Sequence, residues 1–538
     1  MAWAEPQLHP DPQPLPKHTR CILLFYSSLL LFSIGSFANA GPAEPARLPL
    51  LSGQPFIIFW GVPDSSCAGR LNPTSFGMER EGRVAVFYED SLGNYPYFLD
   101  KNTPINGGIP QYTRLDGHVQ KTKQDLEAAL PAPRYLGLGV LRWAEWVPQW
   151  SRNQEKQAMY LEASRKLLRS FFPKWTPEEV EKWSRVDFEA AAQSVMVETL
   201  REVKRLRPKA LWGFSPYPSC YNSDPAQTQL GNYSGQCPPA EMALNDELLW
   251  LWKRSSALFP LLTLEKRQGG TVAARSFLSS QIKEALRVAS VAGAEFDLPV
   301  FPLVKSVYVS SKTFLSQADL INTIGECAAM GTAGVVIWNR SEMKTERECQ
   351  DLAVFVRKVL GPYAVNVTTA TQSCSSSLCQ GKGRCVRQNP DSSAYLHLPS
   401  QPSAADKSTE KAEGAEATQQ PDAETKAAEP DPAEIWKKDF QCQWYKSADG
   451  EISERQPPKD GVSVGGKAEG NTGNAAETRT ASTTKSASES LFRGSDFAGT
   501  GSQTVSVETQ TDSGTNLLAA SSPPLLLLLG AGCLCLCP

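Results

Sequence analysis

The chain has 538 residues, more than one ordinary hydrophobic core accommodates, so we expect several domains or one large barrel with additional segments. Its 54 lysines and arginines are balanced by 57 aspartates and glutamates, and the net charge of −3 excludes a global basic surface for nucleic acid. Only four histidines are present, which argues against a histidine-rich metal site and a histidine-dependent catalytic triad.

The first 40 residues have the pattern of a secretory signal peptide. Lys17 and Arg20 precede an apolar run from Cys21 to Phe32, and a small-residue cleavage site follows at Ala38-Asn39-Ala40. A membrane anchor is the alternative, but the run is shorter than the roughly 20 residues that cross a bilayer. We therefore expect residues 1–40 to be removed and the remaining chain to be exported.

The C-terminal end has the pattern of a signal for a glycosylphosphatidylinositol (GPI) anchor. The small residues Ser513-Gly514-Thr515 precede a polar spacer up to Pro524 and an apolar tail from Leu525, with no basic residue after it. We interpret residues 517–538 as this signal, which predicts attachment to the extracellular face of the plasma membrane, or secretion where no anchor is added. A hydrophobic C-terminus without such a role is the alternative.

Cysteines and sequons agree with export. Removal of Cys21 and of the three cysteines in the tail leaves nine, an odd number, so at least one stays unpaired. Cys374, Cys379 and Cys385 are closely spaced with glycines between them, as at the front of an EGF-like module. Sequons predict N-glycosylation at Asn232, Asn339 and Asn366.

Short apolar runs alternate with amphipathic helical stretches between about residues 50 and 365. This alternation indicates an α/β fold with a parallel sheet covered by helices, and about 315 residues is the size of a β/α barrel, with its site at the carboxyl ends of the strands. The clearest helix starts at a capping box, Thr176-Pro177-Glu178-Glu179, and should reach Arg207 before Pro208. The expected strands lie within the runs 55–60, 83–88, 135–143, 210–214, 257–264, 298–308 and 332–338.

The composition changes after Cys385 to small and polar residues with few large apolar ones. The stretches 387–434 and 446–516 cannot bury enough surface to offset their ordering entropy, so we expect them to be disordered. We interpret 370–445 as a truncated EGF-like module that contains the first stretch as an insertion, and 446–516 as a stalk.

The string from Gly137 to Trp150, GLGVLRWAEWVPQW, resembles the active-site strand of the animal hyaluronidases, a family of glycoside hydrolases. This resemblance covers about residues 50–386 and implies a seven-stranded β/α barrel (50–365) followed by an EGF-like module, with no cofactor and no metal. Further segments agree with the family in order and spacing: 92–97, 106–111, 206–214, 218–222, 232–238 and 334–338. The resemblance also implies four disulfides, which leave Cys327 unpaired: Cys67–Cys349, Cys220–Cys237, Cys374–Cys385 and Cys379–Cys442.

The chemistry implied by the resemblance needs two carboxyl groups that this chain lacks. In the family a glutamic acid protonates the glycosidic oxygen while the N-acetyl group of the substrate attacks, and an aspartate two residues earlier shares a proton with the acid. The spacing places both on one face of a strand. The two positions are Arg142 and Ala144 here, so no catalytic residue is intact. Glu145 is the fallback acid, but strand alternation should point it away unless a bulge re-aims it.

Other polar positions of the family site are also replaced, by Ser215, Ser219, Thr263 and Val309. Tyr95 and Trp338 are retained and would line the sugar site. Arg142 could attract the glucuronate carboxylates of hyaluronan or the sulfates of chondroitin; alternatively, it pairs with Glu145 or another nearby acid.

Three functions follow from these residues. The first is a hyaluronidase-family surface glycoprotein, impaired or inactive as an enzyme, that binds hyaluronan, a chondroitin-type glycosaminoglycan or a protein partner. The second is an active hyaluronidase that uses Glu145 or another acid. The third is an adhesion protein in which the barrel is a rigid head without affinity for sugar.

Overall fold

The computed structural model describes residues 45–63, 67, 69–80, 83–222, 235–309, 311–340, 345–398 and 432–446. The predicted signal peptide and GPI signal, the stalk from 447 onward, Asn232 and most of the predicted insertion lie outside the described residues. Within the described ranges, no helix is both long enough and apolar enough to span a membrane.

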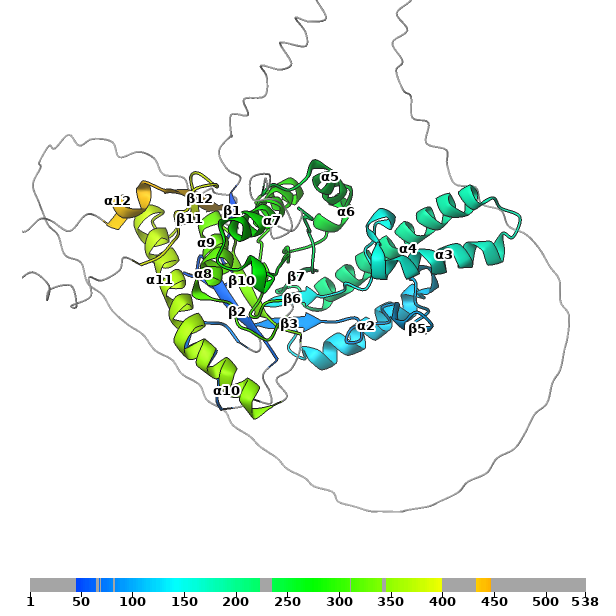
Figure 1. Cartoon of the computed structure of the whole chain (residues 1–538), viewed down its shortest axis with the longest axis horizontal. Helices are drawn as coiled ribbons and strands as arrows, with labels where there is room; N and C mark the ends of the chain where they lie inside the picture. Colours follow the sequence, from blue (N-terminus) through cyan, green and yellow to red (C-terminus); the bar gives the residue numbers. More distant parts are fainter. Residues whose placement is uncertain are drawn as a thin grey trace, which may run out of the picture. The chain divides into compact units, whose positions relative to one another are not determined.

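Parallel strands in the described part of the chain form two sheets (Figure 1). One sheet has the order β2-β10-β9-β8 and the other the order β3-β6-β7. All neighbouring pairs within them are parallel, as expected for strands that are joined through helices. The strands are β2 (Ile57–Gly61), β3 (Val84–Phe87), β6 (Leu138–Leu141), β7 (Leu211–Phe214), β8 (Leu261–Leu262), β9 (Leu303–Lys305) and β10 (Gly334–Trp338).

Backbone hydrogen bonds connect segments that adjoin the two sheets. The Trp60 amide in β2 donates to the carbonyl of Glu79, which precedes β3, at 2.6 Å. The Ser256 amide, which precedes β8, donates to the carbonyl of Trp212 in β7 at 2.7 Å. At each edge of the three-stranded sheet, a hydrogen bond thus joins a strand of one sheet to a segment that precedes a strand of the other.

Side chains along each strand alternate between two hydrophobic environments. In β2, Ile57 and Phe59 belong to a cluster with side chains from both sheets, whereas Ile58 and Trp60 belong to a cluster with helical side chains. In β10, Val336 belongs to the first of these clusters and Val335 to the second. Both faces of these strands are buried, which explains the continuous apolar runs from which the strands were predicted.

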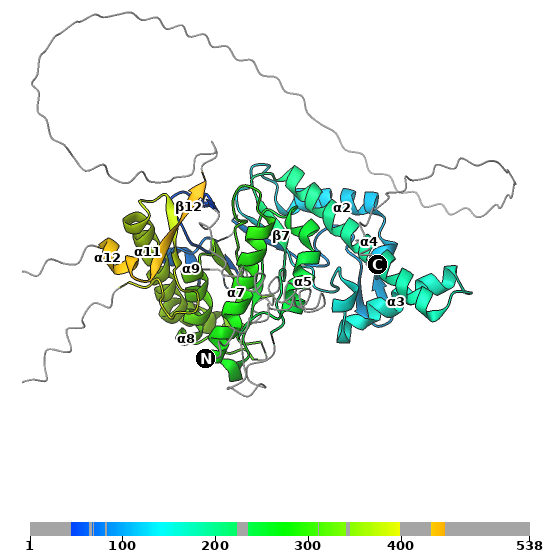
Figure 2. The same cartoon turned by 90° about the horizontal axis from the view of Figure 1, so that it is seen from above.

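Helices pack around the strands, and the predicted capping box is present. Helix α4 (Pro177–Leu206) begins after Thr176, whose hydroxyl accepts from the Glu179 amide at 3.3 Å, while the Glu179 carboxylate accepts from the Thr176 amide at 2.8 Å. In Figure 2, α7 lies between α9 and α5. The other α-helices are α2 (Leu115–Ala129), α3 (Ala158–Phe171), α5 (Pro239–Glu247), α6 (Leu249–Trp252), α7 (Val272–Ala292), α8 (Gln317–Leu320), α9 (Glu326–Met330), α10 (Glu346–Phe355), α11 (Gly361–Leu378) and α12 (Pro432–Lys437).

A small disulfide-bonded unit follows α11. Strand β11 (Gly383–Arg387) pairs antiparallel with β12 (Phe440–Lys446), and β1 (Ala46–Arg47) adds to the far side of β12. A separate hairpin is formed by β4 (Tyr97–Asp100) and β5 (Thr103–Ile105). Cys327 is free and buried. The disulfides are the pairs that the family resemblance implies: Cys67–Cys349, Cys220–Cys237, Cys374–Cys385 and Cys379–Cys442.

Packed structure continues further along the chain than the sequence predicts. Disorder is expected from residue 387, but Leu396 is buried and the Tyr363 hydroxyl lies 3.0 Å from Nε2 of His397. Arg275 on α7 also donates to the carbonyl of Asp391 at 3.2 Å. A few apolar and aromatic side chains in 388–398 therefore suffice to hold this stretch, although its composition is polar on average.

Candidate functional site

Arg142 follows the last residue of β6, at the carboxyl end of the strand. Its amide donates to the carbonyl of Phe87 at 2.7 Å, which continues the pairing with β3. Its guanidinium lies over the ring of Trp338, the last residue of β10, at 5.4 Å from the ring centroid. Two sheets therefore place a cation and an aromatic ring against each other, where the site of a β/α fold is expected.

The guanidinium of Arg142 has no carboxylate partner in the part of the chain that the structure describes. Nε and Nη1 are buried without a hydrogen-bond partner among the described residues, and no ion pair joins Arg142 to Glu145 or to any other described acid. Burial lowers the pKa of Arg142, and this effect is opposed mainly by Tyr217 and Tyr88. Among the described residues, no acid therefore pairs with Arg142, in contrast to the alternative in which a nearby acid neutralises it.

A second cation–aromatic layer lies beside the first. The indole Nε1 of Trp338 donates to the Tyr88 hydroxyl at 2.9 Å, and the Arg340 guanidinium lies over the Tyr88 ring at 4.9 Å from its centroid. Arg340 also forms an ion pair with the largely buried Glu89. Burial raises the pKa of Tyr88, although the hydrogen bond from Trp338 opposes the change.

The sequence interpretation did not single out Tyr88, Glu89 or Arg340. Tyr88 ends one of the predicted strand runs and Arg340 follows another by two residues. Sites of β/α folds form at the carboxyl ends of the strands. The residues at the end of every predicted strand run, including Tyr88 and Arg340, are therefore candidate site residues.

Glu145 lies four residues beyond the end of β6, in a bend. The chain has left the strand at this point, so the alternation that predicted an outward carboxylate does not extend to it. The side chain is half-buried and makes no hydrogen bond or ion pair with the described residues. Burial is the main cause that raises its pKa, Glu89 adds to the increase, and Arg340 and Arg142 oppose it. Glu145 is therefore in the electrostatic field of the site.

Ala144 contributes only a methyl group at the second position that the resemblance assigns to a carboxylate. Its carbonyl accepts from Nε2 of Gln157 at 3.1 Å, which holds the turn after Arg142. Thr263 is half-buried, and Val309 is 44 % exposed and accepts from Nζ of Lys305 through its carbonyl at 3.5 Å. None of these three residues supplies an acidic side chain.

Tyr95 lies in the core beneath these groups. Its side chain is 1 % exposed, its ring is 4.4 Å from that of Trp143, and it stacks on Trp146 at 5.1 Å. Burial raises the pKa of the Tyr95 hydroxyl well above its usual value. Trp143 and Trp146 are equally buried, so these three rings form packed structure rather than an exposed sugar platform in this conformation.

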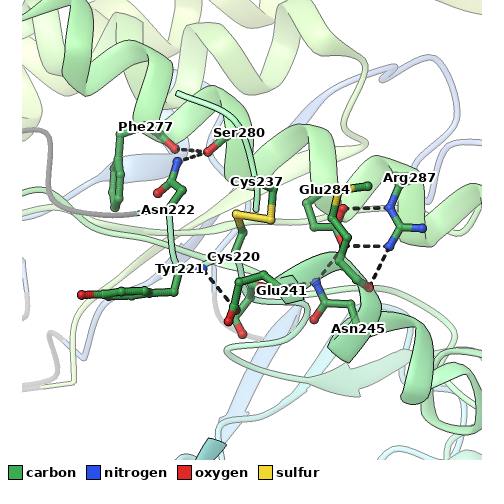
Figure 3. Close-up of a disulfide and its surroundings, with 12 residues drawn as sticks. Cys220, Tyr221, Asn222, Cys237, Glu241, Asn245, Phe277, Ser280, Glu284 and Arg287 are labelled. Carbon is green, nitrogen blue, oxygen red and sulfur yellow. Dashed lines mark hydrogen bonds and ion pairs between the residues drawn. A yellow bond between two sulfur atoms is a disulfide. The ribbon is translucent and has the colours of Figure 1, made fainter. Parts of the chain in front are cut away.

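Residues 215–222, which follow β7, make several contacts with α5 and include an exposed tyrosine (Figure 3). The Cys220–Cys237 disulfide closes this loop, and the Tyr221 amide donates to the Glu241 carboxylate at 3.3 Å. Asn245 donates to the carbonyl of Ser219 at 2.9 Å. The Tyr221 ring is 78 % exposed and points away from the disulfide, so it is a further candidate platform for a sugar.

Ser215 and Ser219 lie in the same loop and are inert as acids. Ser215 is fully buried, and its hydroxyl has no partner among the described residues. The Ser219 hydroxyl accepts from Arg152 at 3.4 Å, and Arg152 also pairs with Glu241 at 2.9 Å. Arg152 is thus neutralised locally, which distinguishes it from Arg142.

Two of the predicted glycosylation sites lie in the described ranges. Asn339 directly follows Trp338 at the end of β10 and is half-buried. Asn366 on α11 is half-buried, and its Oδ1 accepts from the Leu398 amide at 3.2 Å. Glycosylation at either residue stays a prediction.

Comparison with known proteins identifies the family. Residues 45–457 match the family model described as hyaluronidase, among the glycoside hydrolases. The chain belongs to the hyaluronidase family. Hyaluronidase-2 of Mus musculus is 42% identical over 373 residues, which cover 67% of this chain and 79% of the relative. Hyaluronidase-2 of Homo sapiens is 41% identical over 367 residues, which cover 66% and 77%.

Solved hyaluronidase structures agree with this assignment. The crystal structure of bee venom hyaluronidase matches with a TM-score of 0.53 and 29% identity, and covers 58% of this chain and 99% of that one. The same enzyme in complex with a hyaluronic acid tetramer matches with a TM-score of 0.52 and 30% identity, over 58% and 98% of the two chains. The resemblance from sequence motifs is therefore confirmed at the level of the family.

Proposed function

We propose that this hyaluronidase-family protein binds hyaluronan or a chondroitin-type glycosaminoglycan at the carboxyl ends of its strands and cleaves it slowly or not at all. The observation that carries the proposal is the unpaired Arg142 guanidinium on Trp338, at the position that the resemblance assigns to a carboxylate. With Ala144 at the other position, the expected proton donor and its partner are both missing.

We expect slow or absent cleavage because the proton donor and its partner carboxylate are both missing. General acid catalysis contributes roughly 10² to 10⁴ in rate, and correct orientation of the attacking N-acetyl group contributes more. Ser215 and Ser219 carry hydroxyl groups, which cannot replace a carboxylic acid; the Ser215 hydroxyl is fully buried and the Ser219 hydroxyl is bonded to Arg152.

The binding part of the proposal rests on charge. Arg142 has donors without partners, and a carboxylate or sulfate is the group that a guanidinium binds most strongly. Hyaluronan carries one carboxylate in each disaccharide. The complex of bee venom hyaluronidase with a hyaluronic acid tetramer supports a ligand of this class.

The architecture and location are part of the same proposal. We infer that the two sheets form one closed barrel of seven strands, supported by the hydrophobic cluster that draws on both sheets and by the hydrogen bonds at their edges. We also infer a truncated EGF-like module around β11 and β12, export through the N-terminal signal, and a GPI anchor at the extracellular face of the plasma membrane.

An active hyaluronidase is the second candidate, and Glu145 favours it. A general acid needs a pKa above that of an ordinary glutamate, and burial together with Glu89 shifts Glu145 in this direction. Activity that uses Glu145 should be abolished by Glu145→Gln, which keeps the size of the side chain and removes its proton.

The test combines cleavage and binding by the purified secreted chain. Release of reducing ends from hyaluronan is followed at acid and neutral pH, and affinity is measured with a hyaluronan octasaccharide. Binding without cleavage supports the proposal, and cleavage that Glu145→Gln abolishes supports the second candidate. Neither binding nor cleavage would reject both and leave a protein partner or a purely structural head.

A further inference from the structure

A cavity lies at the opposite ends of the strands from Arg142 and Trp338. Its volume is about 500 Å³, within the range of small-molecule sites. Four apolar residues line it near the strand starts: Leu211 begins a strand of the two parallel sheets, and Leu136, Phe301 and Ala333 lie one or two residues before one. We call this space the basal cavity, and β1 and β12 contribute to its wall through Arg47 and Tyr445.

The lining of the basal cavity is strongly cationic. Arg47, Lys209, Arg384 and Lys446 line it, whereas Glu295 is the only acidic residue among its described lining residues. Glu295 lies 3.6 Å from Lys446 and so neutralises one of the four cations. Arg47, Lys209 and Arg384 have no ion pair with a described acid, although Asp297, which accepts from Gln443, also acts on Arg384 electrostatically. The cavity keeps an excess of positive charge, which is the arrangement that attracts an anion.

Arg384 is the buried centre of this charge. Its side chain is 6 % exposed, and only its Nε has a hydrogen bond, to Oε1 of Gln443 at 2.8 Å. Neither Nη nitrogen has a hydrogen-bond partner among the described residues, and Arg384 forms no ion pair with a described acid. Burial lowers its pKa, because the charged form has lost its hydration.

Tyr445 adds a second donor beside Arg384. The side chain is 4 % exposed, and its hydroxyl is buried without a hydrogen-bond partner in the described part of the protein. Buried polar groups normally have a partner, so a hydroxyl without one, next to a guanidinium whose two Nη nitrogens have none among the described residues, indicates a missing acceptor. Arg47 is placed by contact with the Phe296 ring, at 5.8 Å from its centroid.

We propose that the basal cavity binds a compact oxyanion, a sulfate, phosphate or carboxylate group, alone or on a small sugar. Arg384 and Tyr445 donate hydrogen bonds to the oxyanion, while Arg47 and Lys209 at the rim supply long-range attraction. The apolar wall formed by Leu136 and Phe301 accommodates the remainder of a larger ligand. This site is separate from Arg142 and does not depend on the proposed sugar site.

The test is isothermal titration of the full secreted chain with three ligands at low ionic strength. The ligands are inorganic phosphate, inorganic sulfate and a trisulfated heparin disaccharide. We expect saturable binding of one molecule per chain for at least one of them. Binding of the inorganic ions assigns the affinity to the oxyanion itself, and binding of the disaccharide alone shows that the sugar contributes.

Variants decide whether this binding occurs in the basal cavity. Arg384→Gln should weaken it at least tenfold, and so should the rim double variant Arg47→Ser/Lys209→Ser, which is informative even if Arg384→Gln fails to fold. The matched control Arg357→Ser/Lys358→Ser removes two exposed charges elsewhere and should leave the affinity unchanged. The proposal is rejected if no ligand saturates the protein, or if rim and control variants bind equally well.

Discussion

Replacement of Arg142 by methionine should lower affinity for hyaluronan and raise stability at the same time. A charged donor that meets a ligand carboxylate contributes about 1.5 to 3 kcal/mol, so its loss should weaken binding roughly 10-fold to 150-fold. In the free protein, buried donors without partners cost about 1 to 3 kcal/mol, and the stacking on Trp338 returns about 0.5 to 1 kcal/mol. Arg142→Met should therefore stabilise the fold by about 1 kcal/mol, or roughly 2 °C in Tm.

Titration with a hyaluronan octasaccharide and a thermal unfolding curve measure the two effects on the same sample. Arg185→Met is the matched control, because Arg185 is exposed on α4 and pairs only with its neighbour Glu189. This control should change neither quantity appreciably. Unchanged affinity in Arg142→Met, or a loss of both affinity and stability, would refute the interpretation of Arg142 as a ligand-binding cation and indicate a structural role.

Three further predictions concern pH and the loop disulfide. The raised pKa of Glu145 means that the folded state binds more protons than the unfolded state, so ionisation of Glu145 should reduce stability as pH rises. Glu145→Gln should remove this loss. Between pH 4 and pH 7 the Tm of the wild-type chain, relative to that of Glu145→Gln, should therefore fall. Burial lowers the pKa of His118 to about 4, and its Nε2 lies 2.7 Å from the Thr199 hydroxyl. The free energy of unfolding should therefore fall by about 3 kcal/mol as pH falls from 6.5 to 4. Denaturant unfolding of His118→Gln should lack this dependence of the unfolding free energy on pH. Removal of the Cys220–Cys237 bridge by a double alanine variant should lower the free energy of unfolding by about 3 kcal/mol, given the 17-residue separation. It should also weaken sugar binding if the exposed Tyr221 is a platform. An unchanged Tm would show that the other contacts of this loop hold it.

Local patterns in the sequence predicted the elements of the fold well. The strand runs were recognisable because β2 and β10 are apolar on both faces, and the start of α4 was recognisable because its capping box is a contiguous signal. The disulfide pairs, in contrast, came only from the family resemblance, since nine cysteines in one chain allow many pairings.

The site was only partly predictable, because its contacts join residues that are distant in the chain. The hydrogen bond between Trp338 and Tyr88 spans 250 positions, and no local pattern reports it. The alternation argument does not reach Glu145, because the strand ends at Leu141, so the direction of its carboxylate stays a prediction. The basal cavity likewise brings Arg384 and Tyr445 from the C-terminal strand pair to the beginnings of strands that lie far from them in the chain, so its charge could not be recognised from the sequence.

The central claim is that this hyaluronidase-family site binds its polymer without cleaving it. Release of reducing ends from hyaluronan by the purified secreted chain, across acid and neutral pH, tests it most directly. The account predicts no release above the background of an Arg142→Met, Glu145→Gln double variant, in the same preparation that binds the octasaccharide. Release by the wild-type chain that is lost in Glu145→Gln would contradict it and identify Glu145 as the acid.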